Sequence, residues 1–302
     1  MVDYSFTQDI LKGIGFLYIA LTLLALGLAV WLPKRWWGKL MAVALVVGVF
    51  SILPRKAQQE VAQQQVKVDE FKQRYQVAKA LFDERCKTAG EKIYKTVDNV
   101  EGVWLLNVRE QRPSTGQYEA TSDPNWPDAA LPYETAGDFF IINQLGWEQR
   151  SPDSAERGYI NTIAKGASAK GYDFADVKLD NGTIERYRLA FNAPLSPHLS
   201  NLVSEIHKGK PARYAIGFEN NINPEDRRHW VAGTTIKVID TQTNELLAER
   251  TSFAFHSGLG SRSGGQQPWL FADTCPKLRG WHERYPTRLF VDQILKPTQE
   301  KK

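Results

Sequence analysis

The sequence predicts three parts: an N-terminal two-helix transmembrane hairpin, a helical stalk, and a soluble α+β domain that is mainly antiparallel β. Three observations predict them. Two long apolar runs lie near the N-terminus, a segment poor in glycine and proline with helical spacing follows them, and alternating strand patterns begin beyond Gly90. We expect the domain to be a sandwich or barrel with one or two short helices. The expected boundaries are 1–56, 57–98 and 99–302.

The first apolar run extends from Gly13 to Leu32 without a charged residue. At about 1.5 Å per residue, a helix of that length crosses a hydrocarbon core of roughly 30 Å. The second run, Leu40 to Leu53, becomes long enough only if Trp36, Trp37 and Lys39 are included. Lys39 can extend to the headgroups and the two tryptophans favour the interface. We therefore predict spans at about 13–32 and 36–53.

A cleaved signal peptide is the alternative for the first run. It fits poorly, because the leader carries Asp3 and Asp9, has no basic region, and offers no small-residue cleavage site before Pro33. Lys and Arg nearly balance on the two sides of the predicted hairpin. The dense charge of the turn and the acidic leader favour a cytoplasmic turn. We thus expect a bacterial inner-membrane protein with a periplasmic C-terminal domain.

The whole net charge of +4 lies in the N-terminal region. Six of the 38 Lys and Arg and two of the 34 Asp and Glu lie in residues 1–56, so the remainder holds 32 of each sign. A part with no net charge has no global attraction for nucleic acid, and we expect no nucleic-acid partner. The expected partners are the lipid bilayer, a protein, and other copies of the chain through stalk and hairpin.

The chain has two cysteines, Cys86 and Cys275. In an extracytoplasmic domain we expect a structural disulfide between them, and in a cytoplasmic domain two buried free thiols. There is no C-x-x-C pair, so the sequence indicates neither a structural zinc site nor another metal site. We expect no cofactor.

The stalk is predicted from Ala57 to about Thr96, as a helix that continues the second apolar run. Its apolar positions step by sevens, threes and fours and form one stripe. The stripe consists of Val61, Val68, Phe71, Tyr75, Ala78, Phe82 and Cys86. Its partner is either the body of the domain, which we favour, or the same helix of another copy in a coiled coil.

Strands are predicted from β-branched and aromatic runs bounded by turn residues. Two hairpins are well marked, the first by Asn181-Gly182. The predicted single strands are Val100–Val108, Phe139–Leu145 and Arg213–Phe218. The predicted hairpins are Asp173–Leu179 with Thr183–Phe191, and Thr234–Asp240 with Leu246–Phe255.

Two short amphipathic helices are predicted within the domain. One begins at Ser196-Pro197 and extends to Ile206, and the other covers Thr287–Lys296. The segment Arg112–Glu134 is rich in Pro, Ser, Thr, Asp and Gly, and we expect a long loop there.

The glycine-rich run Ser257–Trp269 follows a predicted strand, as a phosphate-binding loop does. It lacks the terminal Lys-Ser/Thr, and Arg262 stands where a nucleophile elbow has serine. We interpret it as a surface loop, with contact to an anion or a partner as the functional alternative. The candidate ligand or partner contacts are Arg262, His256, Arg227, Arg228 and Trp230. The acidic residues Asp123, Asp128, Glu134 and Asp138 lack the spacing of a calcium site.

No catalytic constellation accompanies these features. We expect a membrane-anchored, non-enzymatic interaction or assembly protein with an extracytoplasmic β-rich binding domain. One alternative is a cytoplasmic sensor in which ligand binding makes the hairpin oligomerise and perturb the membrane. Another is a hydrolase that uses His256 and the loop serines.

Overall fold

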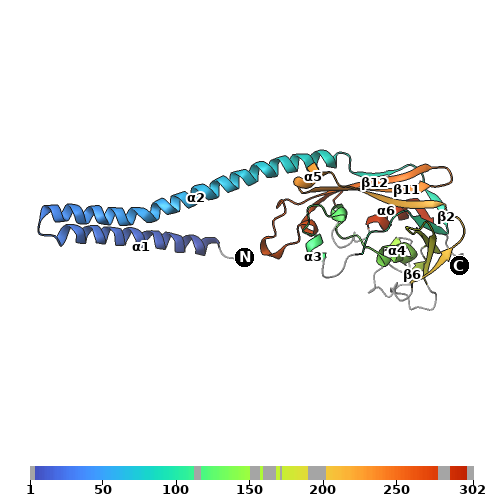
Figure 1. Cartoon of the computed structure of the whole chain (residues 1–302), viewed down its shortest axis with the longest axis horizontal. Helices are drawn as coiled ribbons and strands as arrows, with labels where there is room; N and C mark the ends of the chain where they lie inside the picture. Colours follow the sequence, from blue (N-terminus) through green and yellow to red (C-terminus); the bar gives the residue numbers. More distant parts are fainter. Residues whose placement is uncertain are drawn as a thin grey trace. The chain divides into compact units, whose positions relative to one another are not determined.

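The computed structural model describes residues 4–111, 117–149, 157–158, 168–170, 172–189, 202–277 and 286–297 (Figure 1). Contacts between residues divide the chain into two units, Met1–Gln73 and Arg74–Lys302. We call these unit 1 and unit 2.

Unit 1 is a pair of helices. Helix α1 spans Tyr4–Trp31, and α2 spans Trp36–Cys86, of which residues up to Gln73 belong to this unit. Pro33 follows α1 and cannot continue its hydrogen-bond ladder, so the chain turns there. The hydroxyl of Tyr18 donates to the carbonyl of Phe50, and the two rings lie 5.7 Å apart. The two helices therefore pack side by side and antiparallel.

The two helices of unit 1 cover the segments predicted to cross a membrane. Within the described residues, no helix combines the length and the apolar character needed to cross a membrane. This finding overturns the predicted transmembrane hairpin at 13–32 and 36–53, and with it the predicted inner-membrane location.

The predicted stalk is part of α2, which ends at Cys86, before the predicted end at Thr96. Its apolar stripe divides in two. Val61 and Val68 are 64% and 45% exposed, whereas Ala78 and Phe82 are buried in unit 2. The later part of the stripe thus packs against the body of the domain, the arrangement that we favoured. The coiled-coil interpretation has no support within the described chain.

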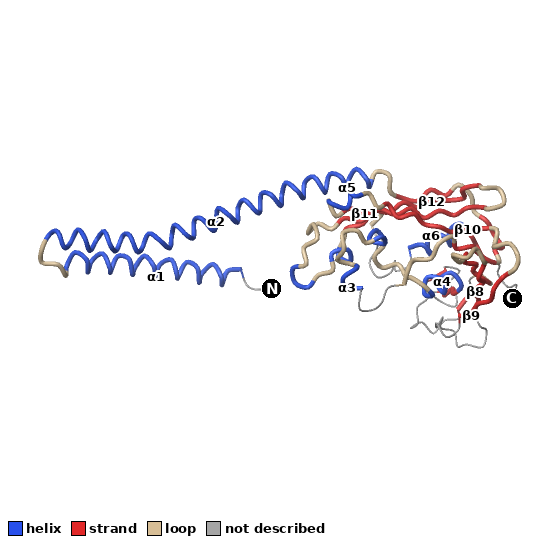
Figure 2. Tube along the Cα trace, viewed as in Figure 1, coloured by secondary structure: helices blue, strands red, loops and turns tan. Residues whose placement is uncertain are grey.

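Unit 2 is built on a mixed sheet of nine described strands, in the order β1-β12-β11-β10-β3-β7-β8-β9, with β13 also beside β12 (Figure 2). The strands of this sheet are β1 Gly90–Ile93, β3 Gly102–Leu105, β7 Phe174–Lys178, β8 Ile184–Leu189, β9 Leu202–His207, β10 Tyr214–Asn221, β11 Val231–Asp240, β12 Glu245–Phe255 and β13 Asp273–Cys275. Separate small sheets pair β2 (Val97–Val100) with β14 (Leu295–Pro297), and β4 (Gly146–Gln149) with β5 (Arg157–Gly158) and β6 (Ser168–Lys170).

The mixed sheet replaces the predicted antiparallel sandwich or barrel. Strand β3 lies between β10 and β7 and is parallel to both, while the other ladders of this sheet are antiparallel. Alternation within a segment shows that one face is buried, but it does not show which strand will lie alongside. The prediction from hairpin patterns therefore missed the two parallel ladders at the centre.

Both predicted hairpins are confirmed. In β7–β8, Gly182 has a φ of +85°, and the side-chain oxygen of Asn181 accepts from the backbone N–H of Thr183 at 3.0 Å. In β11–β12, Asn244 takes the left-handed conformation at a φ of +55°. Strand β10 also agrees with its prediction. The run predicted as one strand at 100–108 contains the end of β2 and all of β3.

Two predicted elements have a different secondary structure in the protein. The predicted strand at 139–145 is helix α4, Asp138–Leu145, whose last six residues are all buried. A short continuous apolar run does not distinguish a buried strand from a buried helix, because neither leaves a polar face. Residues 202–206 of the helix predicted at 196–206 lie in β9, where cross-strand pairing with β8 decides the conformation. The rest of that prediction lies outside the described residues.

Helix α6, Pro286–Ile294, confirms the predicted C-terminal helix. The segment predicted as a loop at 112–134 contains, among its described residues, the helical turns α3 (Gln117–Ala120) and η1 (Pro127–Ala130). Three further short helices follow among the described residues: α5 Pro224–Arg228, η3 Ser263–Gly265 and η4 Pro268–Phe271.

The two faces of β11 and β12 are both covered within unit 2. Phe253 and Phe255 pack against the last turns of α2, and Ala254 between them packs with the tryptophans of η1 and η4. This alternation follows from the two-residue period of a strand. Further along the sheet, the same face as Ala254 meets Phe140 of α4 and Phe290 of α6 in the main core. The end of β11 and β12 near Val231 and Phe255 is thus enclosed from both sides.

Candidate functional site

The candidate contact residues lie on helix α5, at the enclosed end of β11 and β12, and in the loop that follows β12. The side-chain oxygen of Asn223 caps this helix by accepting from the N–H of Glu225 at 2.9 Å, and Pro224 occupies its first turn. The helix ends after one turn, and Trp230 takes a φ of +55° as the chain enters β11. We call α5, Trp230, His256 and the loop 257–265 the α5 corner.

The two adjacent arginines of α5 point to different environments. Arg227 is 1% exposed, and its guanidinium carbon lies 5.6 Å from the ring centroid of Trp269. Burial lowers the pKa of Arg227 to about 10, although three nearby aspartates oppose that shift. Its Nε and Nη2 atoms have no hydrogen-bond partner among the described residues. Arg228 is exposed. Arg228 is therefore accessible to an external partner, and Arg227 is not.

Asp226 precedes Arg227 in α5. It connects this helix to the end of α2. Arg85 donates to its two carboxylate oxygens at 3.1 and 2.9 Å, and Asp226 itself is buried. A bidentate pair of this kind fixes orientation as well as charge. The sequence did not point to this pair, because its members lie on elements 141 residues apart.

His256 is a buried residue that holds the glycine-rich loop. Its Nδ1 accepts from the backbone N–H of Gly260 at 3.0 Å, and its ring meets the edge of Trp230 with centroids 5.9 Å apart. Burial lowers the pKa of His256 and thereby favours the neutral imidazole. Gly260 has a φ of +86°, and a Cβ there would lie 2.1 Å from the Trp230 ring. Glycine is thus required at this close approach.

The exposed part of the loop carries the remaining candidate. Arg262 is exposed, between Ser261 and Ser263, whose hydroxyls hydrogen-bond each other at 3.0 Å. In the contacts described for this loop, His256 bonds to backbone and the two serines bond to each other. The geometry therefore brings His256 and Trp230 into contact, buries Arg227 beside Trp269, and leaves Arg228 and Arg262 on the surface.

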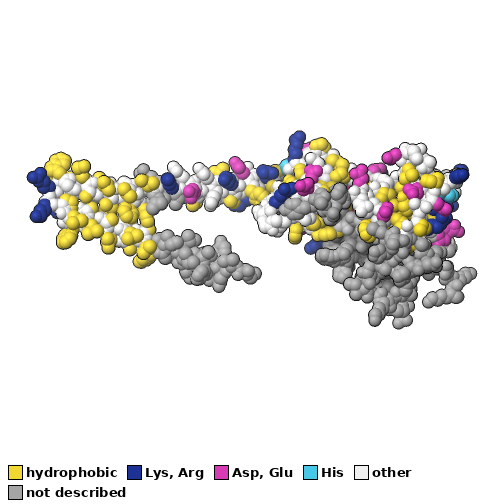
Figure 3. Space-filling model, turned by 60° about the horizontal axis from the view of Figure 1, so that its bottom comes forward, with side chains coloured by type: hydrophobic (Ala, Val, Ile, Leu, Met, Phe, Trp, Pro, Cys, Tyr) yellow, Lys and Arg dark blue, Asp and Glu magenta, His cyan; other side chains and the backbone are white. Residues whose placement is uncertain are grey.

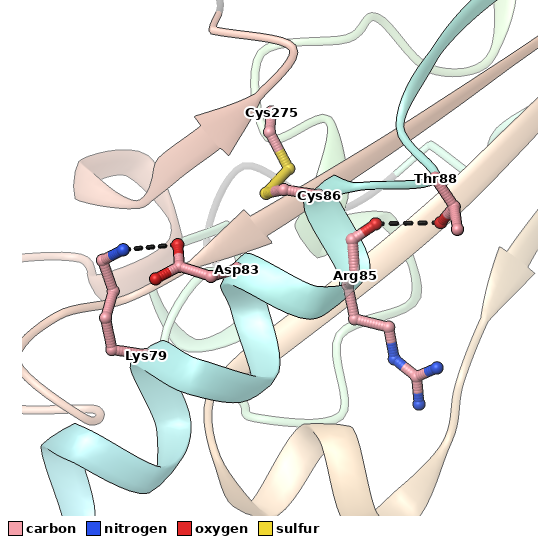
Figure 4. Close-up of a disulfide and its surroundings, with 6 residues drawn as sticks. All are labelled: Lys79, Asp83, Arg85, Cys86, Thr88 and Cys275. Carbon is pink, nitrogen blue, oxygen red and sulfur yellow. Dashed lines mark hydrogen bonds and ion pairs between the residues drawn. A yellow bond between two sulfur atoms is a disulfide. The ribbon is translucent and has the colours of Figure 1, made fainter.

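The cysteines form a disulfide between the end of α2 and β13 (Figure 4). The Cα atoms of Cys86 and Cys275 lie 5.7 Å apart, and the bond joins positions 189 residues apart in sequence. Of the two alternatives predicted for these cysteines, the structure contains the disulfide. With Arg85 and Phe82 it attaches the end of α2 to the domain at three points.

The acidic residues of the 112–134 segment and its surroundings serve separate contacts. Asp128 pairs with the buried Arg109, and Glu134 accepts from the N–H of Thr287 at the start of α6 at 2.9 Å. Burial raises the pKa of Glu134. Asp123 accepts from the N–H of Asn125 within its own turn. No group of three or more His, Cys, Asp or Glu side chains within the described residues is arranged to hold a metal ion.

Comparisons with protein-family models, with curated proteins and with solved structures find no match to this chain.

Proposed function

We propose that this chain is a non-enzymatic interaction or assembly protein, in which unit 1 associates with a second copy of the chain and unit 2 carries the binding domain. The observation behind the proposal is the apolar surface of unit 1. On the face that Figure 3 shows, hydrophobic side chains gather on the described parts of α1 and α2 nearest the turn, and Lys and Arg lie at the turn itself. Exposed apolar area of this extent is typical of an association surface.

The exposure of unit 1 is not confined to one stripe. Leu23 and Leu24, which point about 100° apart around α1, are each 63% exposed. On α2, Met41 is 76% and Leu45 is 67% exposed. A helix that is apolar on several sides is stable only when apolar neighbours surround it. Packing hairpins against one another would cover these side chains from more than one direction.

Unit 2 supports a binding role through the α5 corner. There Arg228 and Arg262 are exposed. The contact between Trp230 and His256 and the ion pair of Arg85 with Asp226 hold the surrounding backbone in place. Arginine is enriched among the residues that contribute most to protein contacts. The disulfide favours action in an oxidising compartment and argues against a cytoplasmic sensor.

The test compares the molar mass of the full chain with that of a Leu24→Ser, Leu45→Ser variant by light scattering over a range of concentrations. The chain mass is 34.2 kDa. We expect the parent protein to form oligomers and the variant to have a clearly lower molar mass at the same concentrations. Phe271→Ser is the matched control, because Phe271 is 61% exposed in unit 2. This control should keep the oligomer.

Two results would overturn the proposal. One is a parent protein that stays monomeric at every concentration. The other is binding of the monomer to phospholipid vesicles in a flotation assay, with the same dependence on Leu24 and Leu45. In that case lipid, and not a second copy, would cover the surface.

A further inference from the structure

The mixed sheet ends at β9, a strand whose outer edge is open in the part of the chain that the structure describes. Among these residues β9 pairs with β8 alone, from Ile184 opposite His207 to Leu189 opposite Leu202, without a register shift (Figure 2). Such an edge presents a row of backbone N–H and C=O groups that a further strand can pair with.

The opposite edge of the same sheet is protected against such pairing. Strand β1 is four residues long and carries Glu91 and Lys92, and Lys92 forms an ion pair with Glu249. Strand β13 is three residues long and is followed by Pro276. Short strands, charged side chains and proline are the usual means by which edges are kept from associating.

Strand β9 is less protected than β1 and β13. It contains no proline, lysine or arginine and is six residues long. Val203 is 49% and Ile206 is 56% exposed. Its one carboxylate, on Glu205, is already paired with Arg188 of β8. The strand is regular, exposes two apolar side chains and has its one carboxylate paired, which are properties that favour pairing with another strand.

We propose that β9 pairs antiparallel with β9 of a second copy, about a two-fold axis at Ser204. This inference concerns unit 2 and does not depend on the association proposed for unit 1. In an isologous pair, residues opposite each other must lie on the same face. An axis at Ser204 therefore places Leu202 of each copy opposite Ile206 of the other.

This register is the one that the side chains favour. Leu202 packs against the main core, and Ile206 lies on the same face four residues later, so each pairing extends apolar contact beyond the sheet edge. Glu205 then faces Val203 of the other copy. The next symmetric register, with its axis at Glu205, would place two like charges directly opposite each other, which is unfavourable.

Cysteine crosslinking tests the register directly and traps a weak complex. In the Ser204→Cys full-length protein, the two introduced thiols meet at the axis, within the roughly 4.5–5.5 Å that separates opposed Cβ atoms. We expect mild oxidation to give a covalent dimer at least ten times faster than in Lys92→Cys, the matched control on the opposite edge. Glu205→Cys is the register control and should crosslink more slowly than Ser204→Cys.

A second substitution tests the surface itself. Adding Ile206→Lys to Ser204→Cys places a charge at an exposed position, so the fold should remain, as circular dichroism would show, while crosslinking falls to the control rate. Equal rates for Ser204→Cys and Lys92→Cys, faster reaction of Glu205→Cys, or no effect of Ile206→Lys would each overturn the proposal.

The crosslinking is repeated with Leu24→Ser and Leu45→Ser in unit 1. If the Ser204→Cys dimer persists, β9 is an association surface separate from unit 1, whether or not the unit 1 oligomer is lost. Loss of that dimer would show that β9 does not pair on its own.

Discussion

At the scale of single residues, unit 2 depends on carboxylates that are buried and paired. Asp240 at the end of β11 is 2% exposed, and Arg213 donates to it from Nε at 3.0 Å and from Nη2 at 2.6 Å. The hydrogen bonds from Arg213 are the main reason that the pKa of Asp240 lies below its ordinary value. The N–H of Gln242 adds a further bond and ties the β11–β12 turn to the same carboxylate.

This contact predicts a pH dependence. Since the pKa of Asp240 is lower in the folded than in the unfolded chain, its contribution to stability is present above the unfolded value near 4 and is lost as the pH falls through the folded value. Asp240→Asn should lower the unfolding midpoint by about 2–4 °C at pH 7 and flatten the decline below pH 4. Thermal melts between pH 3 and 7 measure both effects.

Asp180→Asn is the control for this prediction, since Asp180 is an exposed residue of the β7–β8 turn. It should leave the pH profile unchanged. A profile for Asp240→Asn that parallels the parent at every pH would contradict the assignment.

The candidate site also shows how far sequence reasoning reaches at this scale. Trp230 and His256 were singled out separately, and the structure places them in contact. The sequence could not show that Arg227 is buried while Arg228 is exposed. Both occupy one short helix, and the residue that lies beside Trp269 of η4, far along the chain, is Arg227.

At the scale of elements, local signals decided which predictions succeeded. The turn at Asn181-Gly182 requires a left-handed backbone, which few residues adopt readily, so the signal specified its hairpin. Helix α4 and strand β9 have no such signal. Their conformations depend on the strands and helices that pack around them, and these come from distant parts of the chain.

Phe82 tests whether packing of the last turns of α2 supports unit 2. Its side chain is 6% exposed and stacks on Phe255 with centroids 5.4 Å apart. Phe82→Ala should lower the free energy of unfolding by about 3–5 kcal/mol, because it removes buried apolar area and leaves a cavity. Denaturant titration followed by tryptophan fluorescence measures the change.

Val77→Ala is the matched substitution on the same helix, at a position that is 56% exposed. It should change the free energy of unfolding by no more than about 0.5 kcal/mol. Similar losses in the two variants would mean that the end of α2 does not pack on β12 as described.

At the scale of the whole molecule, α2 belongs to both units, and the disulfide is the covalent link between its end and the last part of unit 2. The Cys86–Cys275 bond spans 189 residues and so encloses most of the β-rich domain. A crosslink that closes a long loop removes many conformations from the unfolded chain. Arg85 and Phe82 hold the same helix end by non-covalent contacts.

The disulfide should therefore stabilise unit 2 without being needed to form it. We expect Cys86→Ser, Cys275→Ser and the double variant each to lose about 3–5 kcal/mol of unfolding free energy, equally, since each removes the same bond. Near-ultraviolet circular dichroism should remain native-like, because Arg85 and Phe82 keep the helix end in place.

Adding reductant to the parent protein should lower its stability to that of the variants, and the variants should not respond. A parent protein whose stability is unchanged by reductant, under conditions that free both thiols, would contradict this account.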